Sequence, residues 1–216
     1  MVRICTAEEA VKDISEGMCI MIGGFLGVGT PERLVQALRE KGTKNLTIIT
    51  NDSAFPGVGV GKLQDNQQIA TLYTSYIGGH PESGRCMGEG TLKVILTPQG
   101  TLAEQIRAGG SGLGGFLTPV GVGTVVEKGK QKIVVADKTY LLEEPLKADV
   151  AFLKAFRADR NGNLVYRFSA RNFNPLMAMA AKLVIVEVEE LVEEGSMNPD
   201  HIVTPGIFVD RLVEGR

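Results

Sequence analysis

Glycine-rich turns are the segments of this sequence best suited to hold a ligand. One lies between an apolar run and a helix that begins near Pro31, and it consists of Gly23, Gly24, Phe25, Leu26, Gly27, Val28 and Gly29. Glycines let a backbone approach a ligand closely, and the N-terminus of a helix favours negative charge. The spacing is not the dinucleotide G-x-G-x-x-G, and the P-loop lysine is missing. We therefore predict an anionic ligand other than ATP or NAD; the alternative is a tight turn without a ligand.

Of two further glycine-rich segments, one is predicted to be a surface loop and the other could bind an oxyanion. Residues 57–62 are similar to a P-loop, but Pro56 replaces its first glycine and Leu63 its Ser or Thr, so we predict a flexible surface loop. A third segment, residues 109–119, includes Gly112, Gly114, Gly115 and Phe116. Its N–H groups could face a developing oxyanion, although a long connector explains the glycines equally well.

Gln99 is the side chain with the clearest chemical potential, because it follows a predicted strand and its amide can donate to a carbonyl oxygen. Spacing alone favours a simple cap or turn residue. Segment 171–175 could bind a carboxylate or phosphate, or merely begin a helix. Four other titratable residues are better explained by capping or by solvated surface positions: His80, Glu82, Glu89 and Glu104.

Composition narrows the class of protein. The net charge is −2, and neither a basic stripe nor a tryptophan is present, which argues against a nucleic-acid surface. The longest nearly apolar run, residues 18–30, is too short for a membrane span, and residues 1–6 do not form a signal peptide. Three isolated cysteines fit a reducing cytoplasm, and two distant histidines give no support to a zinc site.

The elements that must position these residues alternate between strand and helix. The pattern predicts a single domain over residues 1–216 with an α/β fold: an open, mostly parallel sheet, helices on both faces and an antiparallel excursion near the middle. Predicted helices cover 6–15, 31–42, 101–108 and 175–181, with capping boxes at Thr6–Glu9 and Thr101–Glu104 and a cap at Thr30. Predicted strands cover 18–22, 46–50, 69–77, 93–97, 132–136, 140–142, 150–154, 164–166 and 183–188.

Several motifs, in this order, resemble the alpha subunit of the family I CoA transferases of the acetate or butyrate–acetoacetate type. They are Glu16-Gly17, Gly23-Gly24-Phe25 with Gly29 and Pro31, residues 98–102, 112–116, 169–175 and 199–206. The resemblance covers essentially the whole chain. One departure is Glu16, where the family usually has Asp or Asn; it puts little in doubt.

The resemblance implies roles for individual residues. The segment from Gly23 to Gly29 would line the CoA site. Gln99 would hold the thioester carbonyl oxygen, whereas spacing alone favours a simple cap or turn residue at that position. The residues Gly112, Gly114, Gly115 and Phe116 would enclose the reacting acyl group. The family's nucleophile is a glutamate on a beta subunit, marked by Glu-Asn-Gly. This sequence lacks that motif, because Arg160 precedes Asn161-Gly162.

The implied activity is CoA transfer between short-chain acids by a ping-pong mechanism, through a glutamyl-CoA thioester on the partner. Coenzyme A would be a substrate, no metal would be needed, and the enzyme would be a cytoplasmic α2β2 or α4β4 hetero-oligomer. Two alternatives stay open: a sugar-phosphate isomerase or sensor, and a non-catalytic CoA- or nucleotide-binding module. The sequence does not fix the acid pair.

Overall fold

Continuous apolar runs form the central strands of the sheet, as predicted for strands that are covered on both faces. The computed structural model describes residues 2–215. In β2 (Cys19–Ile22), the side chains of Ile20 and Ile22 join one hydrophobic core, while Met21 joins the core on the opposite face. This arrangement explains why the run carries no polar alternation.

The main sheet is parallel except for one short strand. Across residues 2–215 its strand order is β1-β12-β11-β9-β2-β3-β4-β5, with β10 antiparallel to β9. The bounds of the remaining strands are β1 (Arg3–Ile4), β3 (Leu46–Ile49), β4 (Ile69–Thr74), β5 (Lys93–Leu96), β9 (Ala148–Asp159), β10 (Leu164–Val165), β11 (Ala181–Val192) and β12 (Arg211–Glu214). The order changes direction between β2 and β9, where open α/β sheets bind ligands.

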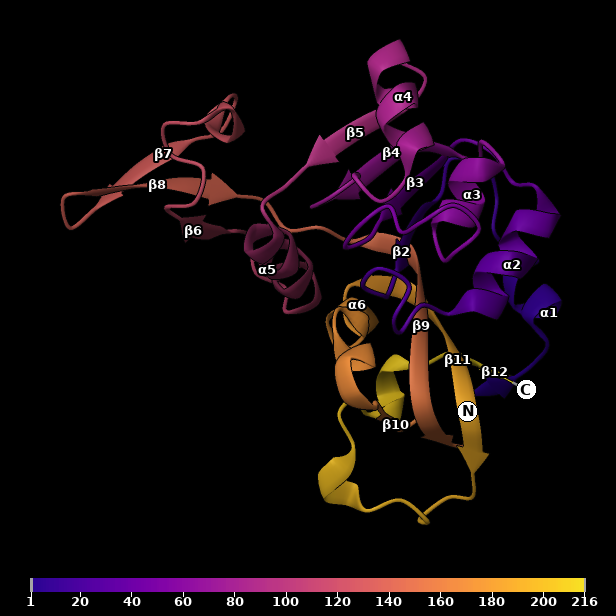
Figure 1. The fold of residues 1–216 in the computed structure, drawn as a ribbon. Helices are drawn as coiled ribbons and strands as arrows, with labels where there is room; N and C mark the ends of the chain where they lie inside the picture. The colour runs from indigo at the N-terminus through magenta and orange to yellow at the C-terminus, as the bar shows by residue number, and fades with distance from the viewer. Residues whose placement is uncertain (1, 216) are drawn as a thin grey trace.

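Helices cover both faces of this sheet (Figure 1). One face carries α1 (Ala7–Val11), α2 (Glu32–Lys41), α3 (Gly61–Asp65) and α4 (Pro81–Glu89); the other carries α5 (Gln99–Gly110) and α6 (Asn174–Ala178). Short 3-10 turns are η1 (Val125–Glu127), η2 (Phe168–Arg171), η3 (Pro199–His201) and η4 (Gly206–Phe208). Within residues 2–215, no helix combines the length and apolar character that crossing a bilayer requires.

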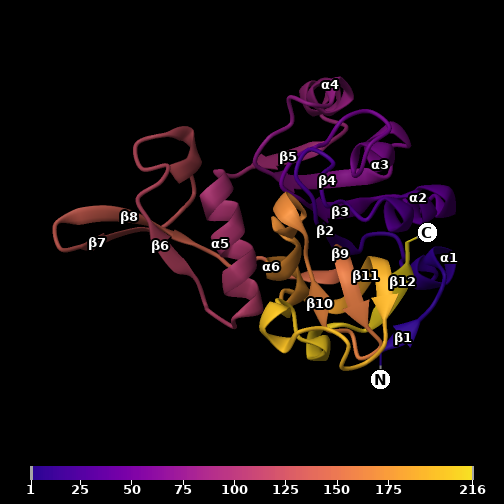
Figure 2. The ribbon, with the colours of Figure 1, turned by 60° about the horizontal axis from the view of Figure 1, so that its bottom comes forward.

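The predicted antiparallel excursion is an arm that projects beyond α5 (Figures 1 and 2). Its strands β6 (Phe116–Thr118), β7 (Lys132–Val135) and β8 (Lys138–Glu143) pair in the order β6-β8-β7. The buried carboxylate of Glu143 fastens the arm to the body. It pairs with Lys130 at 2.5 Å and accepts a hydrogen bond from Gln105 of α5 at 3.0 Å.

The capping predictions had mixed outcomes. The Thr6–Glu9 box is confirmed, although α1 ends at Val11 and not at residue 15. The cap at Thr30 is wrong, because Pro31 occupies the N-cap position and provides no side-chain bond. The second capping box is also wrong: α5 begins at Gln99, so Thr101 lies buried within its first turn.

Two surface predictions are wrong because the structure packs these segments into the interior. Gly61 is buried at the start of α3, where a Cβ would lie 2.1 Å from the Phe55 carbonyl oxygen, so residues 57–62 are not simply a surface loop. His80 is 1% exposed, and its Nε2 lies 3.1 Å from Asp65 Oδ1. Among the helices and strands of residues 2–215, five had not been predicted at all: β1, α3, α4, β6 and β12.

Candidate functional site

A hollow of about 310 Å³ lies where four neighbouring parallel strands end. Its lining residues follow β2, β3, β4 and β5 in turn, and they are Phe25, Leu26, Asn51, Asp52, Ser75, Tyr76 and Gln99. The carboxyl ends of parallel strands share one edge, so residues distant in sequence converge there. This is the edge at which such folds place their ligands.

The floor of this hollow is polar. Gln99 Nε2 donates to Asn51 Oδ1 at 2.8 Å, and Asn51 Nδ2 donates to Asp52 Oδ2 at 2.6 Å. Asn51 and Asp52 are buried, whereas Gln99, at the first position of α5, is exposed. Exposed apolar side chains flank the floor, with Leu26 37% and Tyr76 51% exposed. The hollow thus offers a carboxamide donor beside an apolar wall.

Motifs and spacing identified Gln99 and the glycine segment, whereas four further lining residues had not been predicted: Asn51, Asp52, Ser75 and Tyr76. A signal for them was present, because polar residues directly follow the apolar runs of β3 and β4. Ser75 and Tyr76 were not recognised as strand-end residues, because the predicted strand over 69–77 included them. In the structure β4 ends at Thr74. Counting polar residues at strand ends would have identified all of them.

The glycine segment after β2 forms a tight hairpin. Phe25 and Val28 exchange backbone hydrogen bonds of 2.9 Å, and the two residues between them have positive φ, 47° at Leu26 and 89° at Gly27. These values are those of a two-residue turn that matches strand twist. Packing also requires glycine at its base, since a Cβ at Gly23 would lie 1.9 Å from Asn174 Oδ1.

Two asparagines clamp this hairpin to the opposite half of the chain. Asn172 Oδ1 accepts the Gly24 amide at 3.1 Å, and Asn172 Nδ2 donates to the Val28 carbonyl at 3.0 Å. Asn174 Nδ2 donates to the Gly29 carbonyl, also at 3.0 Å. Segment 171–175 therefore leads into α6, as one of its two interpretations predicted, and it holds the hairpin in shape.

The chain already uses most backbone donors of the hairpin. Amides that donate within the chain are those of Gly23, Gly24, Phe25, Leu26, Val28 and Thr30. The N-terminus of α2 is also filled, because the buried carboxylate of Glu187 accepts the amides of Arg33 at 2.7 Å and Leu34 at 3.3 Å. The N-terminus of α2 is therefore not available to the predicted anionic ligand. In the described chain the amides of Gly27 and Gly29 remain for a ligand.

A second hollow, of about 360 Å³, lies on the other side of the hairpin and includes Val28, Gly29 and Thr30. Its wall carries two cations, Arg167 and Lys154, and one carboxylate, that of Glu189. The Arg167 guanidinium lies 5.0 Å from the ring centre of Phe156 and 4.7 Å from that of Phe168. The other cation, Lys154, pairs with Glu187 at 2.9 Å. Stacked guanidinium groups and aromatic rings suit a ligand with anionic and planar parts.

The glycine segment after α5 is not brought to Gln99 within this chain. Gln99 and Gly110 are the first and last of the 12 residues of α5, which is about 18 Å long. Gly112 has a φ of 71° and ends the helix. At Gly115 a Cβ would lie 2.8 Å from the Glu143 carbonyl oxygen. Gly114 meets no such constraint, and Phe116 begins β6.

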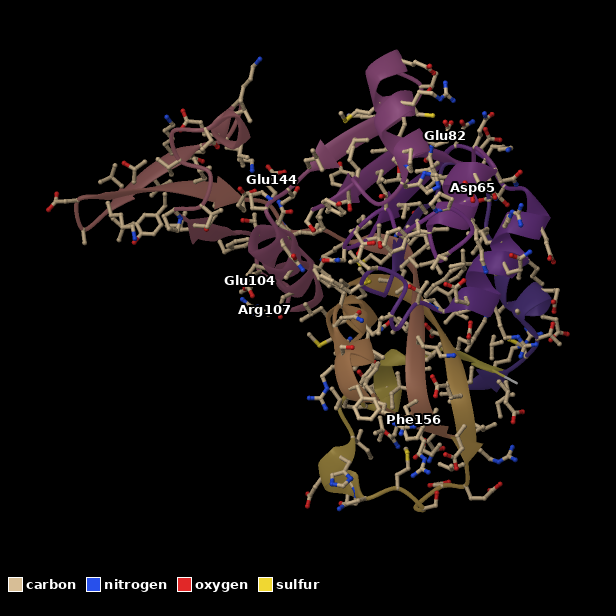
Figure 3. All side chains as sticks on the ribbon, viewed as in Figure 1. Asp65, Glu82, Glu104, Arg107, Glu144 and Phe156 are labelled. Carbon is tan, nitrogen blue, oxygen red and sulfur yellow. The ribbon has the colours of Figure 1, made fainter. Side chains whose placement is uncertain are left out.

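The candidate glutamates lie on helices α4 and α5, where Figure 3 labels Glu82 and Glu104. Arg85 pairs with Glu82 and with Glu89 at 2.6 Å, and Arg107 pairs with Glu104 at 2.7 Å. Within residues 2–215, no glutamate lines the hollow that contains Gln99, and no three His, Cys, Asp or Glu side chains gather as a metal site requires. The prediction of solvated positions is confirmed for Glu82 and Glu89, whereas Glu104, predicted as part of a capping box, pairs with Arg107 instead.

Comparison with known proteins identifies the family. The coenzyme A transferase family model matches residues 4–215. This chain belongs to the coenzyme A transferase family. It is 54% identical over 211 residues to the acetate CoA-transferase subunit alpha of Escherichia coli (strain K12), covering 98% of this chain and 96% of that one. It is also 51% identical over 212 residues to the acetoacetyl-CoA:acetate/butyrate CoA transferase alpha subunit of Clostridium acetobutylicum, covering 98% and 97%.

Solved structures agree on the fold of this transferase subunit. An acyl-CoA transferase of Escherichia coli O157:H7, determined as a thioester complex with CoA, superposes with a TM-score of 0.88 at 21% identity. The match covers 99% of this chain but 50% of that one, so this chain spans half the length of that transferase. The family match and the relatives favour a CoA transferase over both alternatives left open by the sequence.

Proposed function

We propose that this chain is the alpha subunit of a short-chain acyl-CoA:carboxylate CoA-transferase that is active only with a beta subunit. The observation that carries the proposal is the hollow at the strand ends, where the Gln99 carboxamide faces an apolar wall and no glutamate of the described chain is present. The carboxylate that does line this hollow, Asp52, is buried and accepts three hydrogen bonds within the chain, so the nucleophilic carboxylate must come from elsewhere. A partner subunit would supply it.

The reaction follows from that division of roles. A glutamate of the beta subunit attacks the acyl-CoA carbonyl and expels CoA thiolate, which leaves an acyl-glutamyl anhydride. The thiolate attacks the glutamyl carbonyl and expels the first acid as a carboxylate, leaving a glutamyl-CoA thioester. A second carboxylate reverses both steps. Each tetrahedral intermediate carries an oxyanion, and Gln99 would donate a hydrogen bond to it.

We place coenzyme A across the glycine hairpin. Leu26 lines the hollow of Gln99, while Val28 and Gly29 line the hollow of Lys154 and Arg167. A thioester in the first hollow would leave the anionic arm of CoA to reach the cationic wall of the second. The amides of Gly27 and Gly29 would be the backbone donors along that path.

The segment Gly112, Gly114, Gly115 and Phe116 is assigned to the acyl group by family resemblance alone. Gln99 and this segment lie at opposite ends of α5, which is about 18 Å long. The segment would therefore enclose the acyl group only in an assembled enzyme, across a subunit boundary. Removing its glycines in the assembled enzyme should then alter acid preference more than CoA affinity.

The acids, stoichiometry and location are part of the proposal. The names of the relatives support acetate, acetoacetate and butyrate as acids, and a beta subunit as partner. An α2β2 or α4β4 assembly in the cytoplasm completes it. Assay of acid pairs with the co-purified complex, together with its mass in solution, tests these points.

Borohydride labelling tests the division of roles. The complex is treated with acetoacetyl-CoA, reduced with borohydride and mapped by peptide mass spectrometry, because borohydride reduces a glutamyl thioester to an alcohol. The modified glutamate is expected on the beta subunit. A modified glutamate in this chain, or full activity of this chain alone, would refute the proposal.

A further inference from the structure

Asp52 is an anion set into the floor of the hollow and surrounded by donors. It is 4% exposed and accepts hydrogen bonds from the Leu26 amide at 2.9 Å, the Ala54 amide at 2.8 Å and Asn51 Nδ2 at 2.6 Å. An ionised carboxylate only accepts hydrogen bonds. Whatever faces Asp52 must therefore present N–H groups to it.

This requirement fixes the orientation of two side-chain amides, first that of Asn51 and then that of Gln99. Asn51 must turn its Nδ2 toward Asp52, which leaves its Oδ1 as the atom that faces Gln99. An oxygen there can only accept, so Gln99 must present Nε2, as the 2.8 Å contact shows. Without the anion, either amide could rotate by half a turn and exchange its N and O positions.

The direction of the Gln99 amide matters for chemistry. Its Nε2 has two hydrogens, and one is used in the bond to Asn51. The other is available to a developing oxyanion in the hollow. A rotated amide that offered Oε1 there would repel the same charge.

We propose that Asp52 is a positioning residue that sets the polarity of the Asn51–Gln99 pair and so keeps Gln99 a donor. This inference rests on the proposed function of Gln99. Asp52 also binds the Leu26 and Ala54 amides, so the experiment must separate the effect on polarity from a loss of local structure.

A double-mutant cycle in the complex with the beta subunit makes that separation. Gln99→Ala should lower kcat about 100-fold, the usual cost of removing one oxyanion donor. Asp52→Asn should lower kcat at least about tenfold with KM for acyl-CoA changed less than about threefold. In the Gln99→Ala background, Asp52→Asn should have almost no further effect, because the amide it orients is gone.

A matched control is provided by Asp159, the last residue of β9, just before the turn that leads to β10. It is also 4% exposed and also accepts three hydrogen bonds, from the Asn161 amide, the Asn163 amide and Asn163 Nδ2. Asp159→Asn should lower thermal stability to a similar degree and leave kcat unchanged. A second variant, Asn51→Ala, breaks the relay while the two backbone bonds of Asp52 stay in place, and it should match Asp52→Asn in both backgrounds.

The outcomes distinguish the two proposals. Full activity of Gln99→Ala would mean that the proposed role of Gln99 is wrong. If Gln99→Ala is impaired but Asp52→Asn and Asn51→Ala reduce kcat equally with and without Gln99, Asp52 does not act through Gln99. In that case the positioning role is overturned while the oxyanion role stands. Should Asp52→Asn fail to assemble, the Asn51→Ala cycle decides alone.

Discussion

The Nζ of Lys154 on β9 lies 2.9 Å from Glu187 Oε1 on the adjacent strand β11, and both side chains are largely buried. The other oxygen of Glu187 accepts the first amides of α2. The carboxylate thus joins a lysine, a helix and two strands. Because the chain supplies this negative charge itself, the N-terminus of α2 serves stability and leaves ligand binding to neighbouring groups.

Lys154→Met should destabilise the protein strongly. The substitution leaves the Glu187 carboxylate, 2% exposed, without its cation. Removing one partner of a buried pair costs about 3–5 kcal/mol. The two amides of α2 that Glu187 still accepts place the expected loss at the lower end of that range. Urea unfolding measures the loss. Lys182→Met is the control, because its partner is Asp149 and the Lys182 side chain is 83% exposed. Equal midpoints for the two variants would contradict this account.

Gly23→Ala should impair both stability and activity. The added Cβ would lie 1.9 Å from Asn174 Oδ1, so Asn174 must move and release the Gly29 carbonyl. We expect a loss of about 1–3 kcal/mol, typical of an overpacked site. Gly84→Ala, in the interior of α4 where a Cβ meets nothing within 4 Å, should instead stabilise by up to about 1 kcal/mol. Thermal unfolding and CoA-transfer assays compare the two.

Tyr166 should make the fold sensitive to high pH. Burial raises the pKa of its phenol to about 12, against the partial compensation of its 2.8 Å hydrogen bond with Thr204. The folded state therefore keeps a proton that the unfolded state loses near pH 10. This contribution to stability is complete below pH 10 and is lost as the pH rises through 12, up to about 2–3 kcal/mol. In Tyr166→Phe, the free energy of unfolding should depend less on pH between about 10 and 12, as measured by urea unfolding. An unchanged dependence on pH would show that Tyr166 is not the responsible group.

Cys19 should be a poorly reactive thiol. Burial, and secondarily the Asp149 carboxylate, raise its pKa to about 11. At pH 8 its alkylation should be at least about a hundredfold slower than that of an ordinary thiol, because the thiolate is the reactive form. Iodoacetamide labelling followed by mass spectrometry measures the rate, with the urea-unfolded protein as reference. Labelling at the reference rate would show that the thiol is not protected.

The sequence was most informative where one physical signal dominated. Apolar runs predicted the strands around Met21, Ile48 and Leu153 because covered strands need no alternation, and Gly42 did end α2 in a left-handed conformation. Caps were less predictable, since the group that caps α2 is Glu187, which lies 154 positions from Arg33 in the chain. Local patterns cannot contain such a partner.

The site was predicted only in part for the same reason. Gln99 and the hairpin were found through motifs, but the partners of Gln99 come from another strand end. The buried position of His80 depends on Asp65, a contact between two helices that no spacing reveals. Where contacts far along the chain decide the role of a side chain, local patterns indicate candidates, and the three-dimensional packing selects among them.

The pairing of β1 with β12 has a consequence for biosynthesis. Arg3 aligns with Arg211 and Ile4 with Leu212, so the first strand has no sheet to join until the last strand exists. During synthesis on the ribosome, β1 must therefore stay unpaired until β12, about 200 residues later, has emerged. Termination of translation before Arg211 would remove the strand that accepts β1, and the resulting fragment should be a substrate for proteases.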